Sequence, residues 1–138
     1  MGPLLHFRGC AGGVWRLSAT LTSATEPPLL VTGDGGRAQP VRLTDEPGEA
    51  LWRYDFTLAM GPEPREATYA IGDRSWRVAV PAISGGLRVA FTACNGDETE
   101  EGAWTTSRNE RWTHLHRHNE RTPFHLLIQG GDQIYADG

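Results

Sequence analysis

Apolar and polar residues alternate in several short stretches within the first 84 residues of the chain. Every second residue is apolar from Val14 to Leu21, from Leu51 to Leu58 and from Ser75 to Val80. A period of two is typical of a β-strand with one face in a core and the other in water. We therefore predict three half-buried strands. The residues predicted to point inward include Trp15, Trp52, Phe56 and Trp76.

Shorter apolar pieces and turn-forming clusters lie between these strands. The apolar pieces are at 29–31, 41–43 and 68–71, and the clearest turn clusters are Thr32 to Gly36 and Ile71 to Arg74. Short strands separated by frequent turn signals are typical of an antiparallel sandwich. We predict that residues 1–84 form an all-β sandwich of the immunoglobulin or fibronectin type.

The pattern changes after a small, turn-prone segment at 81–86, which predicts a domain boundary with a second domain at 85–138. The run from Leu87 to Thr92 is almost continuously apolar, as expected of a strand buried on both faces of a parallel sheet. A polar, acidic loop follows from Asn95 to Thr106, and Phe124 to Ile128 reads as a second buried strand.

A helix is predicted between these two strands, from Arg108 to about Arg121. Ser107 and Glu110 have the S-x-x-E spacing of a capping box, and Pro123 ends the helix. The residues predicted to share its inner side are Trp112, Leu115 and Asn119. Strand, helix and strand together predict a βαβ unit with parallel strands and a right-handed crossover.

The composition narrows the classes of function. The 138 residues include 13 arginines, no lysine and 17 acidic residues, for a net charge of -4, which does not suit a nucleic-acid binder or a membrane-surface binder. The sequence has neither a signal peptide pattern nor a membrane-length apolar stretch, so we expect a cytoplasmic protein. Two cysteines are too few for a disulfide framework, so Cys10 and Cys94 are interpreted as thiols.

The candidate chemistry lies where the two parallel strands end. In an open α/β sheet, the functional crevice is just beyond the carboxyl ends of the strands. Cys94 and Asn95 follow the first strand, and Asp132 and Tyr135 follow the second. A thiolate, a carboxylate and a phenolate brought together would repel one another unless a cation lay between them. The glycine pair before Asp132 allows the close backbone approach that a metal or phosphate site requires.

Each of these residues also has a structural explanation. Cys94 can be a small buried residue, Asp132 a turn or N-cap residue, and Tyr135 a packing residue. The positions of the histidines in the sequence favour structural roles for them. His114, His116 and His118 lie on the predicted helix, away from the strand ends, and are interpreted as a solvated surface, while His6 and His125 are interpreted as structural.

The second half of the chain resembles a known family. The strings LRVAFTACN at 87–95, ERW at 110–112 and PFHLLIQGGDQIYAD at 123–137 are similar to the opening of the metallophosphatase domain of PhoD-like alkaline phosphatases. Members of that family carry an N-terminal β-sandwich followed by a calcineurin-like metallophosphoesterase domain. The resemblance covers the segment from Leu87 onward by motif and the preceding segment by architecture.

The resemblance implies a metal-dependent phosphoesterase that hydrolyses phosphate monoesters or diesters. It implies that Cys94, Asp132 and Tyr135 are metal ligands, with Cys94 and Tyr135 binding Fe(III), and that the cofactors are Fe(III) and Ca(II). It assigns no role to Asn95 or Asp137, and no catalytic residue apart from the metal ligands.

The sequence departs from the family pattern because the later Asn, Asp and His ligands do not occur before Gly138. We therefore expect an incomplete domain that is inactive alone, whether as a segment of a longer enzyme or as half of a split enzyme whose missing part is its partner. The alternative is a non-enzymatic β-sandwich binding or interaction module with a βαβ tail. For that alternative, Trp15, Trp52 and Trp76 on strand faces could line a ligand or partner surface, but their alternation favours a core position.

Overall fold

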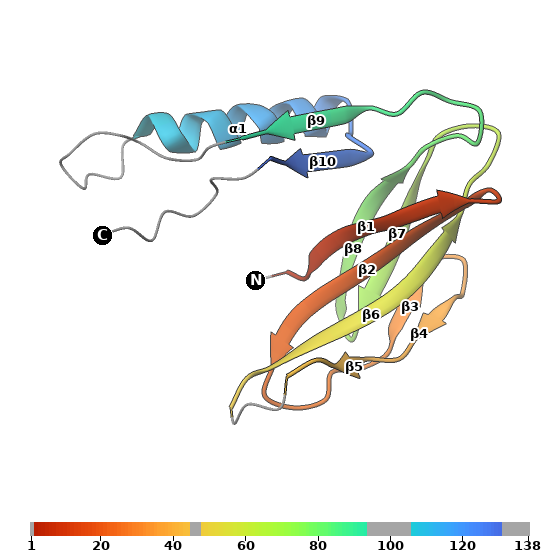
Figure 1. The fold of residues 1–138 in the computed structure, drawn as a ribbon, viewed down its shortest axis with the longest axis vertical. Helices are drawn as coiled ribbons and strands as arrows, with labels where there is room; N and C mark the ends of the chain where they lie inside the picture. Colours follow the sequence, from red (N-terminus) through yellow and green to blue (C-terminus); the bar gives the residue numbers. More distant parts are fainter. Residues whose placement is uncertain (1, 45–47, 94–105, 131–138) are drawn as a thin grey trace. The chain divides into compact units, whose positions relative to one another are not determined.

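The computed structural model of the chain describes residues 2–44, 48–93 and 106–130, with the backbone alone at 106–109 (Figure 1). The chain divides into two compact units, Met1–Gly86 and Leu87–Gly138, called unit 1 and unit 2 below.

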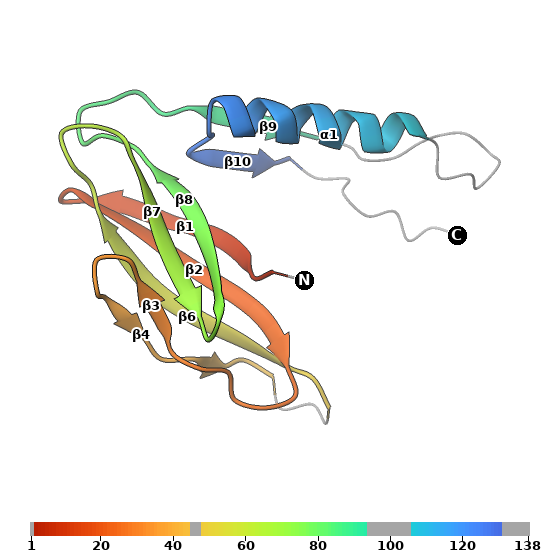
Figure 2. The same cartoon turned by 180° about the vertical axis from the view of Figure 1, so that it is seen from behind.

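Unit 1 consists of two antiparallel sheets with four strands each, seen from opposite sides in Figures 1 and 2. The first sheet has the order β1-β2-β6-β5, with bounds Leu4–Ala11, Val14–Ser23, Ala50–Ala59 and Val41–Arg42. The second has the order β4-β3-β7-β8, with bounds Arg37–Ala38, Leu30–Thr32, Arg65–Ile71 and Arg74–Val80. The β-rich, antiparallel character predicted for this segment is confirmed.

One hydrophobic core lies between the two sheets. The ring of Phe56 on β6 packs against that of Tyr69 on β7, with 5.3 Å between ring centroids. The buried members of the core are Trp15, Leu17, Ala19, Leu30, Ala38, Tyr54, Phe56, Leu58, Ala67, Tyr69, Ile71 and Val80. Both sheets contribute side chains, so each covers the apolar face of the other.

The alternation in the sequence correctly predicted which residues are buried. Trp15 and Phe56, 1% and 7% exposed, belong to this core, whereas Trp52, 8% exposed, is buried on β6 but is not among the members of the core. Trp76 on β8 is half-buried at the border of the core, where its ring stacks on Tyr69 at 5.4 Å. Trp15 and Trp52 are therefore structural, because a buried ring cannot line an exposed ligand surface.

Glycines with positive φ close two of the hairpins. Gly12 and Gly13, with φ of 60° and 72°, form the two-residue turn between β1 and β2. Gly72, with φ of 61°, begins the corresponding turn between β7 and β8. Tight hairpins favour such turns because their twist matches that of the strands, and glycine adopts positive φ without steric strain. The second turn lies in a cluster predicted from the sequence, but the first was not predicted.

Strand β1 was also not predicted, and it contains a bulge. Phe7 pairs with Leu17 and Gly9 pairs with Arg16, which leaves Arg8 as an extra residue on β1. Beyond the bulge, Cys10 pairs with Trp15 and so lies on the face of the sheet that carries the core. The Cys10 thiol is 3.3 Å from the sulfur of Met60.

Unit 2 contains a βαβ arrangement of strand β9, Val89–Thr92, helix α1, Thr106–Arg121, and strand β10, Leu126–Gln129. The two strands are parallel neighbours, as predicted. Helix α1 lies along one face of the pair (Figures 1 and 2).

The helix begins earlier than the sequence suggested but presents the predicted side. Because α1 starts at Thr106, Ser107 lies within its first turn and is not the N-cap residue. Trp112, Leu115 and Asn119 are the half-buried positions among residues 110–121, and their neighbours are exposed. Asn119 Oδ1 accepts a hydrogen bond from the Phe124 N–H at 2.9 Å, which ties the end of the helix to the turn before β10.

The strands of unit 2 are more exposed than predicted. Ala90 is buried, but Val89 and Phe91 on the opposite face of β9 are 44% and 66% exposed, and Ile128 on β10 is 42% exposed. The prediction of a strand buried on both faces is therefore wrong for the part of unit 2 that the structure describes. The physical reason is that the described part of this sheet has two strands with α1 along one face, which leaves much of its apolar surface uncovered by described residues: Leu127, the register partner of Ala90, is also 40% exposed.

Candidate functional site

The predicted metal ligands, Cys94, Asp132 and Tyr135, lie outside the described residues, as do Asn95 and Asp137. Their positions relative to one another therefore remain predictions. The structure does describe the two strands from which these segments emerge.

The carboxyl ends of β9 and β10 lie side by side. Thr92 and Gln129, the last residues of the two strands, are partners in the parallel register. The Gly130 N–H donates a hydrogen bond to the Thr92 carbonyl at 2.7 Å, so the pairing extends one residue beyond β10. The chain thus leaves both strands at the same edge of the sheet.

Space at this edge is limited. A Cβ atom added at Gly130 would lie 2.5 Å from Cζ of Phe91, so any side chain there would displace the Phe91 ring. Thr92 Oγ1 is buried and has no hydrogen-bond partner among the described residues. Thr92 was not predicted as a site residue, and the signal in the sequence that could have pointed to it is its place as the polar last residue of an apolar strand.

Arg88 and His125 form a network at the opposite, amino-terminal ends of the strands. The Arg88 backbone N–H donates to His125 Nδ1 at 2.9 Å, and the His125 N–H donates to the Arg88 carbonyl at 2.9 Å. The Arg88 guanidinium donates through Nε to the Pro123 carbonyl at 2.8 Å and lies 3.0 Å from His125 Nε2. The structural role expected of His125 agrees with its burial, whereas the contribution of Arg88 was not predicted.

The pKa of His125 is lowered from its ordinary value. Burial of the ring disfavours the charged imidazolium, and the positive charge of Arg88 disfavours it further. The ring is therefore neutral at neutral pH.

The other histidines lie at the surface. His114, His116 and His118 are exposed on α1, in agreement with a solvated helix face. His116 is 3.4 Å from the carboxylate of Glu120, and the ring of His118 stacks on that of Phe124. His6 on β1 is within hydrogen-bond distance of the Thr20 hydroxyl, at 2.9 Å.

Within the described ranges, no group of three or more His, Cys, Asp or Glu side chains is arranged to hold a metal ion. Cys10 is exposed and forms no disulfide.

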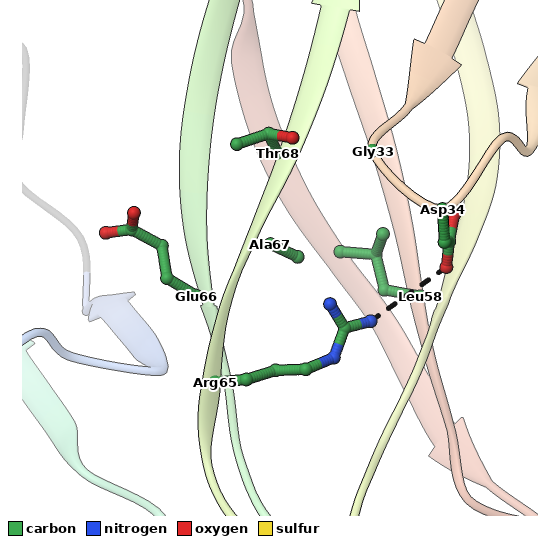
Figure 3. Close-up of a pocket in the computed structure, with 7 residues that line it drawn as sticks. All are labelled: Gly33, Asp34, Leu58, Arg65, Glu66, Ala67 and Thr68. Atoms are coloured by element: carbon green, nitrogen blue, oxygen red, sulfur yellow. Dashed lines mark ion pairs between the residues drawn. The ribbon is translucent and has the colours of Figure 1, made fainter.

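A small pocket of about 230 Å³, lined by both polar and apolar residues, lies in unit 1 between the turn after β3 and strand β7 (Figure 3). Arg65 points across it toward Asp34, and their charged groups are 3.9 Å apart. The pKa of Asp34 is lowered chiefly by the hydrogen bond from the Thr32 hydroxyl. Arg65 also donates two hydrogen bonds to the Ala59 carbonyl, so its guanidinium helps to join β6 to β7. We therefore interpret the residues that line this pocket as structural, because their contacts stabilise the turn after β3.

No family model, curated protein or solved structure matches the chain. None of the helices in the described residues has both the length and the apolar character needed to cross a membrane.

Proposed function

We propose that the chain combines an immunoglobulin-like accessory domain with the beginning of a PhoD-like metallophosphoesterase domain. The activity is hydrolysis of phosphate monoesters or diesters. The observation that carries the proposal is the parallel pairing of Thr92 with Gln129, because these residues precede the two segments with candidate metal ligands.

The spacing along the chain supports a shared site. Cys94 is two residues beyond Thr92, and Asp132 is three residues beyond Gln129. An extended chain spans about 3.3–3.6 Å per residue, so both side chains are within reach of one ion near this edge of the sheet. If both bind that ion, the Cys94 sulfur and the Asp132 carboxylate should be within about 6 Å of each other.

The donor set suits the metals named by the resemblance. Cys94 and Tyr135 offer a thiolate and a phenolate, which suit Fe(III), and Asp132 offers a carboxylate for either metal. When bound, such ions polarise a phosphate ester and increase the acidity of water. This chain would contribute the three ligands, while the absence of a side chain at Gly130 accommodates the Phe91 ring.

The topology of unit 1 supports the immunoglobulin-like part of the proposal. If β1 to β8 are assigned in chain order to strands A, B, C, C′, D, E, F and G, the two sheets have the orders A-B-E-D and C′-C-F-G. The constant immunoglobulin type has A-B-E-D opposite C-F-G, and variable types add C′ next to C. The strand order therefore agrees with an immunoglobulin-like arrangement.

The proposal is tested on the protein that contains this sequence together with whatever residues follow Gly138 in its gene. Loaded with iron and calcium, it is expected to hydrolyse p-nitrophenyl phosphate or its bis ester, and to show a visible charge-transfer band from tyrosinate to iron. Asp132→Ala should lower the rate by about 100-fold or more, because a ligand is lost. Tyr135→Phe should remove the band, and His116→Gln, on the exposed helix surface, is the matched control.

Unchanged colour and iron content in Tyr135→Phe would contradict the assignment of the iron site. The segment 1–138 alone is expected to be inactive, because three ligands do not complete the site. Turnover by the segment that Asp132→Ala abolishes would show that the site is complete without later residues.

A non-enzymatic binding module is the second candidate. A ligand surface made of strand tryptophans does not fit unit 1, because Trp15 and Trp52 are buried there. No described residue favours this candidate over the phosphoesterase. Absence of both metal binding and hydrolysis in the experiment above would favour it.

A further inference from the structure

The contacts between Arg88 and His125 require a neutral imidazole. A neutral ring has one nitrogen that accepts a hydrogen bond, and a protonated ring has none. Both ring nitrogens lie close to Arg88 donors, with the backbone N–H at 2.9 Å from Nδ1 and the guanidinium at 3.0 Å from Nε2. Whichever nitrogen accepts, protonation removes the acceptor and brings an imidazolium against a guanidinium.

Among the described residues, none compensates for that charge on His125. Burial of the ring disfavours the imidazolium, and the charge of Arg88 acts in the same direction. On the α1 side, the adjacent Phe124 contacts the His118 ring and the uncharged Asn119 side chain. Glu120 on α1 is paired with His116 and is not among the groups that act on the His125 ring.

The location of these contacts links them to the start of unit 2. Arg88 is the second residue of unit 2. Its carbonyl accepts hydrogen bonds from the N–H groups of His125 and Leu126, and its Nε–H bonds the Pro123 carbonyl. These bonds fasten the segment that enters β9 to the segment that enters β10.

We propose that His125 is a pH-operated latch, which holds the entry segments of β9 and β10 together at neutral pH and releases them in mildly acidic solution. The proposal concerns unit 2 alone and is independent of the phosphoesterase assignment.

Proton linkage determines how the stability of the latch changes with pH. The released histidine titrates near its ordinary value of about 6.5, and the latched histidine titrates lower. Above about pH 6.5 both states are neutral, so the latch is fully stable. As the pH falls below this value, the released state binds the proton first, and latch stability decreases until the pH is below the latched pKa.

The test measures amide hydrogen exchange by NMR in the whole chain between pH 7.5 and 5. The protection factors of the Arg88, His125 and Leu126 amides are expected to be constant above pH 6.5. Below it they should fall by up to about tenfold per pH unit, since opening binds one proton. His125→Asn keeps an acceptor oxygen near the place of Nδ1 and cannot titrate, so its protection should not depend on pH. His116→Gln, which removes an exposed histidine, should retain the pH dependence.

Protection that is independent of pH in the wild-type chain would overturn the proposal, as would an equal pH dependence in His125→Asn. The His125 ring proton resonances provide a second measurement that needs no variant. They should titrate below pH 6.5, and a midpoint at or above this value would also overturn the latch.

Discussion

Replacing Trp15 with alanine is expected to lower the free energy of unfolding of unit 1 by about 3–5 kcal/mol. The side chain is 1% exposed and belongs to the core shared by the two sheets. Its ring also contacts Phe7 on β1, with 4.3 Å between centroids, so the substitution removes support from the edge strand as well. Urea denaturation followed by circular dichroism measures the loss.

Trp15→Phe separates packing from hydrogen bonding. The Trp15 Nε1 atom is buried without a hydrogen-bond partner among the described residues, so phenylalanine removes no described hydrogen bond. It should therefore cost clearly less than alanine. Trp76→Ala, at the half-buried border of the core, should also cost less than Trp15→Ala. Equal stability of Trp15→Ala and the wild-type chain would contradict the assignment of Trp15 to the core.

Unit 1 is expected to lose stability steeply between about pH 10 and pH 12, because two buried tyrosines resist ionisation. Burial raises the pKa of Tyr54 and of Tyr69 to about 12, and the nearby Glu26 adds to the effect on Tyr54. The Tyr54 hydroxyl also donates a hydrogen bond to the Pro28 carbonyl at 2.7 Å, which ionisation would remove.

The free energy of unfolding decreases with rising pH because the tyrosines lose their protons at a lower pH in the unfolded state than in the folded state. Unfolded tyrosines ionise at about pH 10, so their stabilising contribution is complete below that pH and is lost as the pH rises toward the folded value. Because the pKa rises to about 12, the free energy of unfolding is expected to decrease by about 2–3 kcal/mol for each tyrosine once the pH exceeds the folded pKa. The chain has no lysine, so phenol absorbance near 295 nm can be compared with unfolding in this range without lysine titration. The double variant Tyr54→Phe with Tyr69→Phe should unfold less steeply with pH, and an unchanged profile would contradict the prediction.

The core of unit 1 could be predicted from the sequence because a single face of each long strand is apolar. A period of two in β2 and β6 determines which residues face inward, and the burial of Trp15 and Phe56 agrees with it. The same reasoning could not find β1, because its residues are exposed on both faces or lie at the edge of the sheet. The Gly12-Gly13 pair before Val14 was the available signal, since two adjacent glycines between apolar stretches favour a tight hairpin.

In unit 2 the sequence predicted the elements better than their burial. The apolar residues of β9 and β10 correctly predicted strands, but the exposure of Phe91 depends on what covers each face of the sheet, which local pattern does not specify. The Arg88 and His125 contacts join residues 37 positions apart, so no local spacing reveals them. The candidate ligands Cys94, Asp132 and Tyr135 lie outside the described residues, and their assignment still rests on the motif and on the register of the strands that precede them.

Because of the bulge at Arg8, the number of residues in β1 determines which face of the sheet each of its side chains lies on. Because Arg8 is an extra residue, the strand changes parity there, and Cys10 comes to the same face as Trp15 and next to Met60. A chain shortened by this one residue would keep a regular ladder, because the residues on either side of Arg8 already pair with consecutive residues of β2. Because the Gly12-Gly13 turn fixes the pairing at the end of β1, a deletion closer to the N-terminus would turn the residues before it to the other face. Removal of Arg8 is therefore the length change that leaves the facing of the other β1 residues as it is.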